Sequence, residues 1–377
     1  MVASSADVMK VLSKSTTFPV TPYQNSINTF PPPKGLEHFL LADLNPERHD
    51  REKEAFKSAM KSGHECRAEI RKHAESLVEL VEQRRDGKID VVKDVAKRLP
   101  IKVFATYFGV PTGGGMPEDD MYLHISRIFW ALFMNPDKNR TVQLEAVASV
   151  ELLQKYLDWL VLARKAKVLA SSKPPQDVLG KFIWYYGHLE SPYRDVFLSQ
   201  ERVVANICGI LIGGVVGFVQ AIAFIVEVLT KQHIDAWPGA VSAANGDRVD
   251  ELWGYAREAL RFKPQAPGIL RGTGASGATL GEVFIPPNNV VLASHQSAMM
   301  DEMLVPDPTR FDPTRPDSCY LHFGYGRNRC LAEDLAPVII TEGLRAILRL
   351  KKVHRPAGGE LKMGEPYPES LVLSYDK

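Results

Sequence analysis

The chain has 377 residues and a formal net charge of +1, with 45% of its residues hydrophobic and 24% charged. This ordinary globular composition excludes low-complexity, collagen-like and disulfide-scaffold proteins. The balance of 46 basic against 45 acidic residues gives no electrostatic reason to expect nucleic acid as a partner.

Apolar periodicity and breaker residues predict a series of helices in the first half of the chain. A loop is expected from Thr17 to Lys34, where three consecutive prolines occur, and Asn45 begins a charged helix. The glycine run at 113–115 is expected to be a loop. The expected helices cover residues 6–12, 45–62, 65–85, 91–108, 119–134, 141–168, 176–187 and 193–198.

A long apolar helix is expected over residues 200–230, with Ser199 as its N-cap. No charge occurs from Val203 to Val226, and glycines recur every fourth residue, so the segment is a transmembrane candidate by hydropathy. The alternative is a fully buried central helix. Its flanks lack an aromatic belt with a basic rim, which favours the buried helix and predicts no membrane span.

After a helix expected at 249–262, the sequence loses its helical periodicity. Glycine, threonine and proline punctuation predicts strands and turns over 268–295, and short strands again over 351–375. A helix is expected between them, over 332–350. The pattern as a whole predicts a mainly helical protein with a small β region.

The four cysteines form no CxxC pair and fit no zinc module: Cys66, Cys208, Cys319 and Cys330. Residues 1–18 lack the continuous apolar stretch of a secretion signal. These two features together predict a reducing, cytoplasmic setting.

Cys330 follows a glycine-rich loop and precedes the helix expected at 332. A helix N-terminus stabilises a thiolate over a thiol. A thiolate suits a soft metal centre, and as a heme ligand it favours O–O cleavage. The glycines would let the backbone approach a flat cofactor. For an isolated cysteine, the alternative is a buried structural residue in a turn.

The loop resembles the cytochrome P450 signature F-x-x-G-x-[RH]-x-C-x-G at Phe323, Gly326 and Cys330. It departs from that signature at Asn328, where arginine or histidine is usual, and at Ala332, where glycine is usual. Further matches follow the order of the family: 45–53 for P-x-x-H-x-x-x-R, 99–111 for a helix ending in G-V-P, 258–261 for E-x-x-R and 311–315 for F-x-P-x-R.

The resemblance implies one heme domain over residues 1–377, with the P450 fold but without its usual first helix and leading strands. Either Met1 begins a short member of the family, or a preceding domain has been removed. The implied cofactor is heme b, with the Cys330 thiolate as the iron ligand. The other implied cofactor-binding residues are His49, Lys53 and Arg271 at the propionates, and Phe323, Gly326 and Asn328 in the loop.

The apolar helix is similar to the one that crosses the distal face of the heme in this family. The family carries A-G-x-[DE]-T-T there, so Val216 replaces the acid and Gly217 the alcohol. These groups normally relay protons for dioxygen activation, and valine and glycine cannot. The nearest polar residue on the helix is Gln220. The catalytic candidates on this helix are Gly213, Gly214, Val216, Gly217 and Phe218.

A distal helix without a proton relay suits a lipophilic substrate that already contains an O–O bond. We therefore expect an oxidoreductase of the fatty-acid hydroperoxide isomerase or peroxygenase type, with a fused or separate oxygenase domain as a candidate partner. Residues 257–271 also resemble the P450 part of fatty-acid dioxygenase fusions. Two alternatives stay open: a dioxygen-dependent monooxygenase with redox partners, and a heme-binding sensor without turnover.

Overall fold

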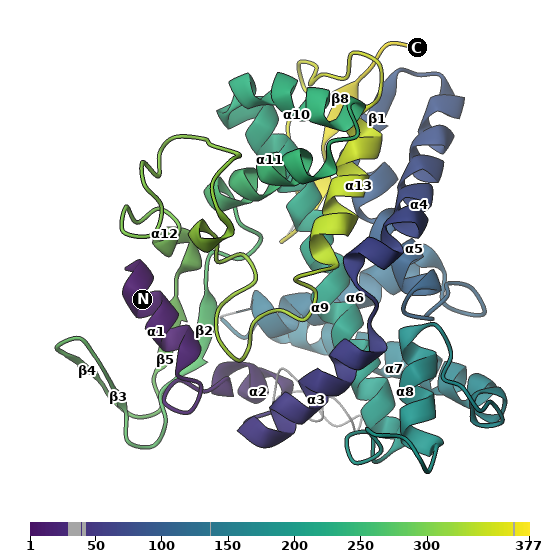
Figure 1. The fold of residues 1–377 in the computed structure, drawn as a ribbon, viewed down its shortest axis with the longest axis vertical. Coiled ribbons are helices and arrows are strands. Elements are labelled where there is room, and N and C mark those ends of the chain that lie inside the picture. The colour runs from purple at the N-terminus through teal and green to yellow at the C-terminus, as the bar shows by residue number, and fades with distance from the viewer. Residues whose placement is uncertain (29–38, 40–42, 136, 365) are drawn as a thin grey trace. The chain divides into compact units, whose positions relative to one another are not determined.

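A computed structural model describes residues 1–28, 39, 43–135, 137–364 and 366–377. Helices are the main element, and the described strands form four two-stranded antiparallel sheets (Figure 1). The predicted class, mainly helical with a small β region, is confirmed. Pro31, Pro32 and Pro33 lie outside the described residues.

The chain divides into two compact units that are interleaved in the sequence. Unit 1 contains residues 1–18, 62–100 and 217–377, and unit 2 contains residues 19–61 and 101–216. The helix α9, Gln200–Glu227, includes residues of both units. That residues 1–377 form one domain stays a prediction.

Unit 2 is helical in its described residues. Asn45 caps α3 by accepting a hydrogen bond from the backbone N–H of Arg48 at 3.0 Å, and Pro46 occupies the first helical position, where its missing N–H costs nothing. Its helices are α2 Thr21–Asn28, α3 Pro46–Ala59, α6 Glu118–Phe133, α7 Arg140–Leu169 and α8 Val178–Gly187; α5 Arg98–Thr106 begins in unit 1.

Unit 1 combines helices with all the described strands. Its α4 begins with a reciprocal capping box between Ser62 and Glu65. Its helices are α1 Ser5–Ser13, α4 Gly63–Arg84, η3 Val91–Ala96, η4 Val228–Gln232, η5 Ile234–Ala236, α10 Trp237–Asn245, α11 Val249–Phe262, α12 His295–Ala298, η6 Asp317–Cys319 and α13 Ala336–Leu348.

The strands of unit 1 are short, and three of the four pairs have a regular register, while the pairing of β6 with β7 shifts between Lys362 and Met363. β1 Lys88–Asp90 pairs with β8 Val372–Ser374, and β2 Ile269–Gly272 pairs with β5 Val290–Ala293. The other pairs are β3 Ala278–Leu280 with β4 Val283–Ile285, and β6 Lys362–Met363 with β7 Pro368–Ser370. One hydrophobic core of this unit packs α1 against β3 and β5 through Val8, Val11, Leu12, Leu280 and Val291.

The long apolar helix was expected to be a buried core helix. Residues 200–232 are long and apolar enough to cross a membrane, but 78% of the most apolar window is buried inside the protein. Ser199 accepts a hydrogen bond from the backbone N–H of Arg202 at 3.3 Å, as expected of its N-cap. The burial agrees with a core helix rather than a membrane span.

Four local predictions were wrong. The loop expected at 17–34 contains α2, whose Tyr23 packs its ring 5.5 Å from that of Phe133. Residues 193–198 form turns, although Phe197 is fully buried. α10 was not predicted. The C-terminal helix begins at Ala336 rather than at 332, because Pro337 lacks an N–H and fits only the first turn of a helix.

Candidate functional site

The Cys330 loop is a tight turn that closes on itself. The Cys330 N–H donates to the Phe323 carbonyl at 2.9 Å, and the Arg329 N–H donates to the Gly326 carbonyl at 3.1 Å. Gly326 has a φ of +74°, and a Cβ there would lie 2.9 Å from the Ser13 Cα. Glycine is therefore required at this position by both conformation and space.

The Cys330 sulfur is exposed, unlike those of the other three cysteines, which are buried. The Ala332 N–H donates to its Sγ at 3.4 Å. The expectation that a helix N-terminus faces the sulfur was wrong, since turns occupy residues 331–335 and α13 begins at Ala336. The group that would stabilise a thiolate is instead the Ala332 N–H in the turn.

Beyond the first turn of α9, its accessible residues form one narrow face. Gly213 is exposed, while Ile210, Gly214 and Gly217 are half-buried; their spacing of i, i+3, i+4 and i+7 places all four on one side of the helix. A Cβ built at Gly213 or Gly217 would meet no atom within 4 Å. A strip of bare backbone therefore borders open space.

The remaining distal candidates lie away from this strip. Val216 is 0% exposed and Phe218 is 7% exposed, so both side chains are packed into the protein. The position of the missing alcohol, Gly217, thus belongs to the open strip, and the position of the missing acid, Val216, does not.

The predicted propionate ligands divide between the two units. His49 and Lys53 are one turn apart on α3, His49 buried and Lys53 half-buried. Arg271 lies in unit 1 on β2, where it is 2% exposed and donates to the Leu270 carbonyl at 2.9 Å. Their role at propionates stays a prediction.

Sequence reasoning missed a buried ion pair beside His49. Glu52 on α3 is 0% exposed and pairs with Arg202 at the start of α9, which is 8% exposed. Burial raises the pKa of Glu52 to about 7, and the positive charge of Arg202 offsets this rise only in part. Glu52 precedes Lys53 in the sequence, but nothing in the local pattern indicates a partner 150 residues away.

We expect the contribution of Glu52 to the stability of the protein to fall as the pH rises from about 4.5 to about 7. Glu52 has a higher pKa in the folded chain than in the unfolded one, so the unfolded chain releases its proton first. The effect is up to about 3 kcal/mol over this window. Burial lowers the pKa of His322 to about 4, so this histidine contributes in the opposite direction over the same window. The measurement is therefore the difference in urea unfolding free energy between Glu52→Gln and the parent protein, which should shift in favour of the variant as the pH rises.

The matched control for this variant is Glu54→Gln, because the Glu54 side chain is 60% exposed on the same helix. Glu54→Gln should keep the parent's pH dependence. An unchanged slope in Glu52→Gln would contradict the assignment.

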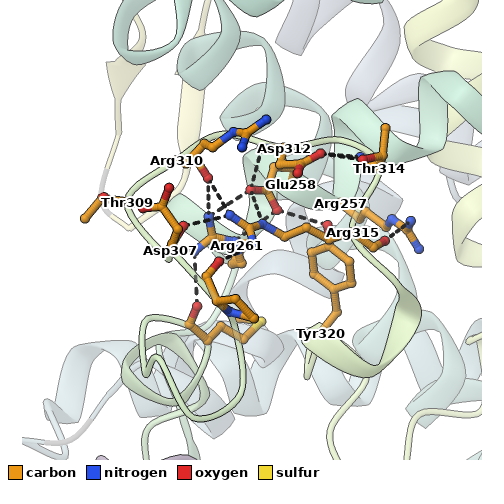
Figure 2. A network of polar contacts seen from close by, with 12 residues as sticks. Arg257, Glu258, Arg261, Asp307, Thr309, Arg310, Asp312, Thr314, Arg315 and Tyr320 are labelled. Carbon is orange, nitrogen blue, oxygen red and sulfur yellow. Dashed lines mark hydrogen bonds and ion pairs between the residues drawn. The ribbon is translucent and has the colours of Figure 1, made fainter.

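A buried polar network in unit 1 surrounds Glu258 of α11 (Figure 2). Arg261 binds both carboxylate oxygens of Glu258, at 3.0 and 2.8 Å, and Arg315 donates to Oε1 at 3.2 Å. The Asp312 N–H and the Tyr320 hydroxyl add bonds of 3.0 and 2.9 Å. Burial opposes the ionisation of Glu258, but these donors outweigh it and hold its pKa below the ordinary value.

The guanidinium groups of Arg261 and Arg315 extend the network to the backbone of residues 299–310. Arg261 is 0% and Arg315 is 7% exposed. Together they donate to the carbonyl oxygens of Met299, Pro306, Asp307 and Arg310. Glu258 therefore organises the segment from 299 to 320, which leads directly into the Cys330 loop.

The residues present fit a flat, metal-containing cofactor. Cys330 offers an exposed sulfur with an N–H donor, which is a soft ligand suited to iron. Gly217, in the same unit, presents bare backbone, and a Cβ there would meet no atom within 4 Å. Among the described residues, no group of three or more histidine, cysteine or acidic side chains could hold a bare metal ion.

Comparison with known proteins agrees with this geometry. The family model described as Cytochrome P450 matches residues 255–374. The structure resembles that of cytochrome P450 CYP109Q5 from Chondromyces apiculatus with a TM-score of 0.76 and 23% identity, over 99% of this chain and 89% of that one. The likeness confirms the predicted fold.

Two curated relatives are similar over most of this chain. A bifunctional dioxygenase–epoxy alcohol synthase of Fusarium oxysporum is 26% identical over 80% of this chain, which spans 27% of that protein's length. The cyclomarin C epoxidase CymV of Salinispora arenicola is 27% identical over 77% of this chain and 68% of its own.

Proposed function

From the premise that this chain is a cytochrome P450 oxidoreductase, we propose that it acts on a lipophilic hydroperoxide without a reductase. The family implies a heme cofactor; we propose heme b, with the Cys330 thiolate as its ligand, and His49, Lys53 and Arg271 at its propionates. When bound, heme with a thiolate ligand supplies O–O bond cleavage.

The observation that carries the proposal is the open strip of α9. Gly213 and Gly217 present bare backbone, and Val216 contributes no acid. The strip therefore leaves room for a substrate and offers no side chain that delivers protons. The nearest polar residue, Gln220, is a neutral amide that is 2% exposed.

A hydroperoxide removes the need for protons and external electrons. Its O–O bond is reduced while a carbon centre of the same molecule is oxidised, so both oxygens stay in the product and the electrons balance. The fungal relative named for both a dioxygenase and an epoxy alcohol synthase supports this reading, because a dioxygenase makes the peroxide that such a synthase consumes. A fused or separate oxygenase is the proposed partner, in a cytoplasmic setting.

The test is incubation of the heme-loaded protein with a fatty-acid hydroperoxide labelled with oxygen-18 in both peroxide atoms, without reductase. We expect a rearranged product that retains both labels. Cys330→Ser should abolish turnover and the thiolate-type spectrum of the carbon monoxide complex, whereas Cys319→Ser, with a buried thiol, should preserve both. Absence of product both with the hydroperoxide and with dioxygen plus a reductase would contradict the proposal and favour a heme-binding sensor without turnover.

A dioxygen-dependent monooxygenase is the second candidate. It is favoured by the similarity to the epoxidase CymV, of which the alignment covers 68%. This reading requires protons from water or from a substrate hydroxyl, since Val216 and Gly217 supply none. Product formation that depends strictly on a reductase and dioxygen would establish it and contradict the hydroperoxide proposal.

A further inference from the structure

The Cys330 loop begins with a tight turn over residues 321–324, which has His322 and Phe323 at its centre. The Gly324 N–H donates to the Leu321 carbonyl at 2.9 Å and closes this turn. The Phe323 carbonyl then accepts the Cys330 N–H at 2.9 Å. The orientation of the turn therefore decides where the backbone of Cys330 lies.

The side chain of His322 ties this turn to α11. Its Nε2 lies 2.8 Å from the carbonyl oxygen of Arg257, which comes 65 residues earlier in the chain. A carbonyl oxygen can only accept a hydrogen bond, so Nε2 carries the proton and donates it. Burial lowers the pKa of His322 to about 4, so the ring is neutral near pH 7 and keeps this tautomer. Its Nδ1 is buried without a hydrogen-bond partner among the described residues, which leaves the bond to Arg257 as the anchor of the ring.

Aromatic contacts bring the residues on both sides of His322 to the same helix. The Tyr320 ring stacks on the His322 ring, with centroids 5.3 Å apart and an angle of 26° between the planes. The Tyr320 hydroxyl donates to Glu258 of α11 at 2.9 Å (Figure 2). The Phe323 ring lies 6.4 Å from the ring of Trp253, which is also on α11. The turn therefore rests on α11 before and after His322.

Two hydrogen bonds farther along the loop stabilise its shape. The Arg329 N–H donates to the Gly326 carbonyl at 3.1 Å, and the Ala332 N–H donates to the Cys330 sulfur at 3.4 Å. Each joins one loop residue to another, so neither orients the loop against α11. The bond of His322 does so, and it leads to a helix that the buried carboxylate network of Figure 2 holds in place.

We propose that His322 is a positioning residue for the heme ligand: its bond to the Arg257 carbonyl holds the turn that presents Cys330 to the cofactor. The inference rests on the proposed ligation of heme by Cys330. The effect passes from the His322 side chain to its backbone, then through the Phe323 carbonyl to the Cys330 N–H. His322 thus acts on the sulfur through the backbone of the loop.

The first experiment is amide hydrogen exchange in the full-length, heme-loaded protein, followed at the Cys330 amide. His322→Leu keeps an apolar side chain of moderate size but has no donor, so this amide should exchange about tenfold faster than in the parent protein. His322→Gln should restore the protection, because the amide nitrogen of glutamine can take the place of the histidine Nε2. His322→Asn should not, because its amide nitrogen corresponds to Nδ1 and stops short of the Arg257 carbonyl.

His295 provides a matched and stringent control in the same unit. It is 4% exposed on α12, and its Nε2 lies 2.6 Å from the Ala266 carbonyl, so it makes the same kind of bond outside the Cys330 loop. It is also close enough to His322 for charges on the two rings to repel each other. His295→Leu should lower the midpoint of thermal unfolding and leave the exchange of the Cys330 amide as in the parent.

The second experiment is the absorption spectrum of the reduced carbon monoxide complex of the same variants. His322→Leu and His322→Asn should lose most of the thiolate-type spectrum, whereas His322→Gln and His295→Leu should keep it. If His322→Leu does not fold, the asparagine and glutamine variants, which differ by one methylene group, carry the comparison.

Unchanged exchange or an unchanged spectrum in His322→Leu would overturn the proposal. Equal results for His322→Asn and His322→Gln would also overturn it, as would a loss in His295→Leu as large as that in His322→Leu. A parent protein without a thiolate-type spectrum would contradict the proposed ligand itself, and the exchange rates in the same samples would still decide whether His322 holds the loop.

Discussion

The double variant Val216→Asp, Gly217→Thr should turn over a fatty-acid hydroperoxide at least about tenfold more slowly than the parent protein. Val216 is 0% exposed, and a buried carboxylate costs several kcal/mol unless it is paired. Threonine at 217 would place a hydroxyl and a methyl group in the space that the glycine leaves open. The measurement is the initial rate of hydroperoxide consumption without reductase.

The same variant separates the two candidate functions. A positioned acid–base group typically contributes 10²–10⁴-fold in rate. If the protein activates dioxygen poorly for want of protons, reductase-driven product formation should rise by a factor of about that size. A clear rise would contradict the hydroperoxide proposal.

Gly217→Thr alone is the matched control for folding. A Cβ at this position meets no atom within 4 Å, so the threonine fits without rearrangement. The midpoint of thermal unfolding should stay near that of the parent protein, whereas Val216→Asp alone should lower it. A loss of rate in Gly217→Thr at unchanged stability would then report on the open strip itself.

Glu258→Ala should lose about 3–5 kcal/mol of unfolding free energy, enough to abolish folding in a marginally stable protein. The substitution leaves Arg261 and Arg315 buried without their carboxylate, and it removes the acceptor of the Tyr320 hydroxyl. Urea unfolding with and without heme is the measurement. Both forms should be destabilised, because the chain's own residues in unit 1 form the network.

Asp317→Asn provides the contrast. Asp317 pairs with Arg257 at the edge of the same network, but its side chain is 95% exposed. An exposed pair contributes about 0–1 kcal/mol, so this variant should unfold almost as the parent does. Equal effects of the two substitutions would show that the Glu258 network is not the structural centre inferred from Figure 2.

Local signals in the sequence predicted the ends of several helices. Asn45 with Pro46 begins α3, and Ser199 caps the start of α9, as predicted. The motifs at 258–261 and 311–315 were found in the sequence as separate family matches, and the structure joins Glu258, Arg261 and Arg315 directly in the buried network. Short-range capping and an ordered set of motifs were sufficient in these cases.

Other features depend on contacts that no local pattern encodes. Glu52 looks like one more charge on a charged helix, and only burial against Arg202 makes it unusual. Tyr320 joins Glu258 from 62 residues away. The start of α13 is marked in the sequence by Pro337, although the helix was predicted to begin at residue 332.

Unit 1 draws its residues from both ends and the middle of the chain, and this has a consequence for how it folds during synthesis. β1, at 88–90, pairs with β8, at 372–374, so it leaves the ribosome long before its partner does. Val2 likewise bridges to Ala293. Contacts so distant in sequence form slowly, and the early segments stay exposed until residues 372–374 have been made. Unit 1 should therefore complete its folding only after residue 374 has left the ribosome, and chains stopped before residue 372 should depend on chaperones to stay free of aggregation.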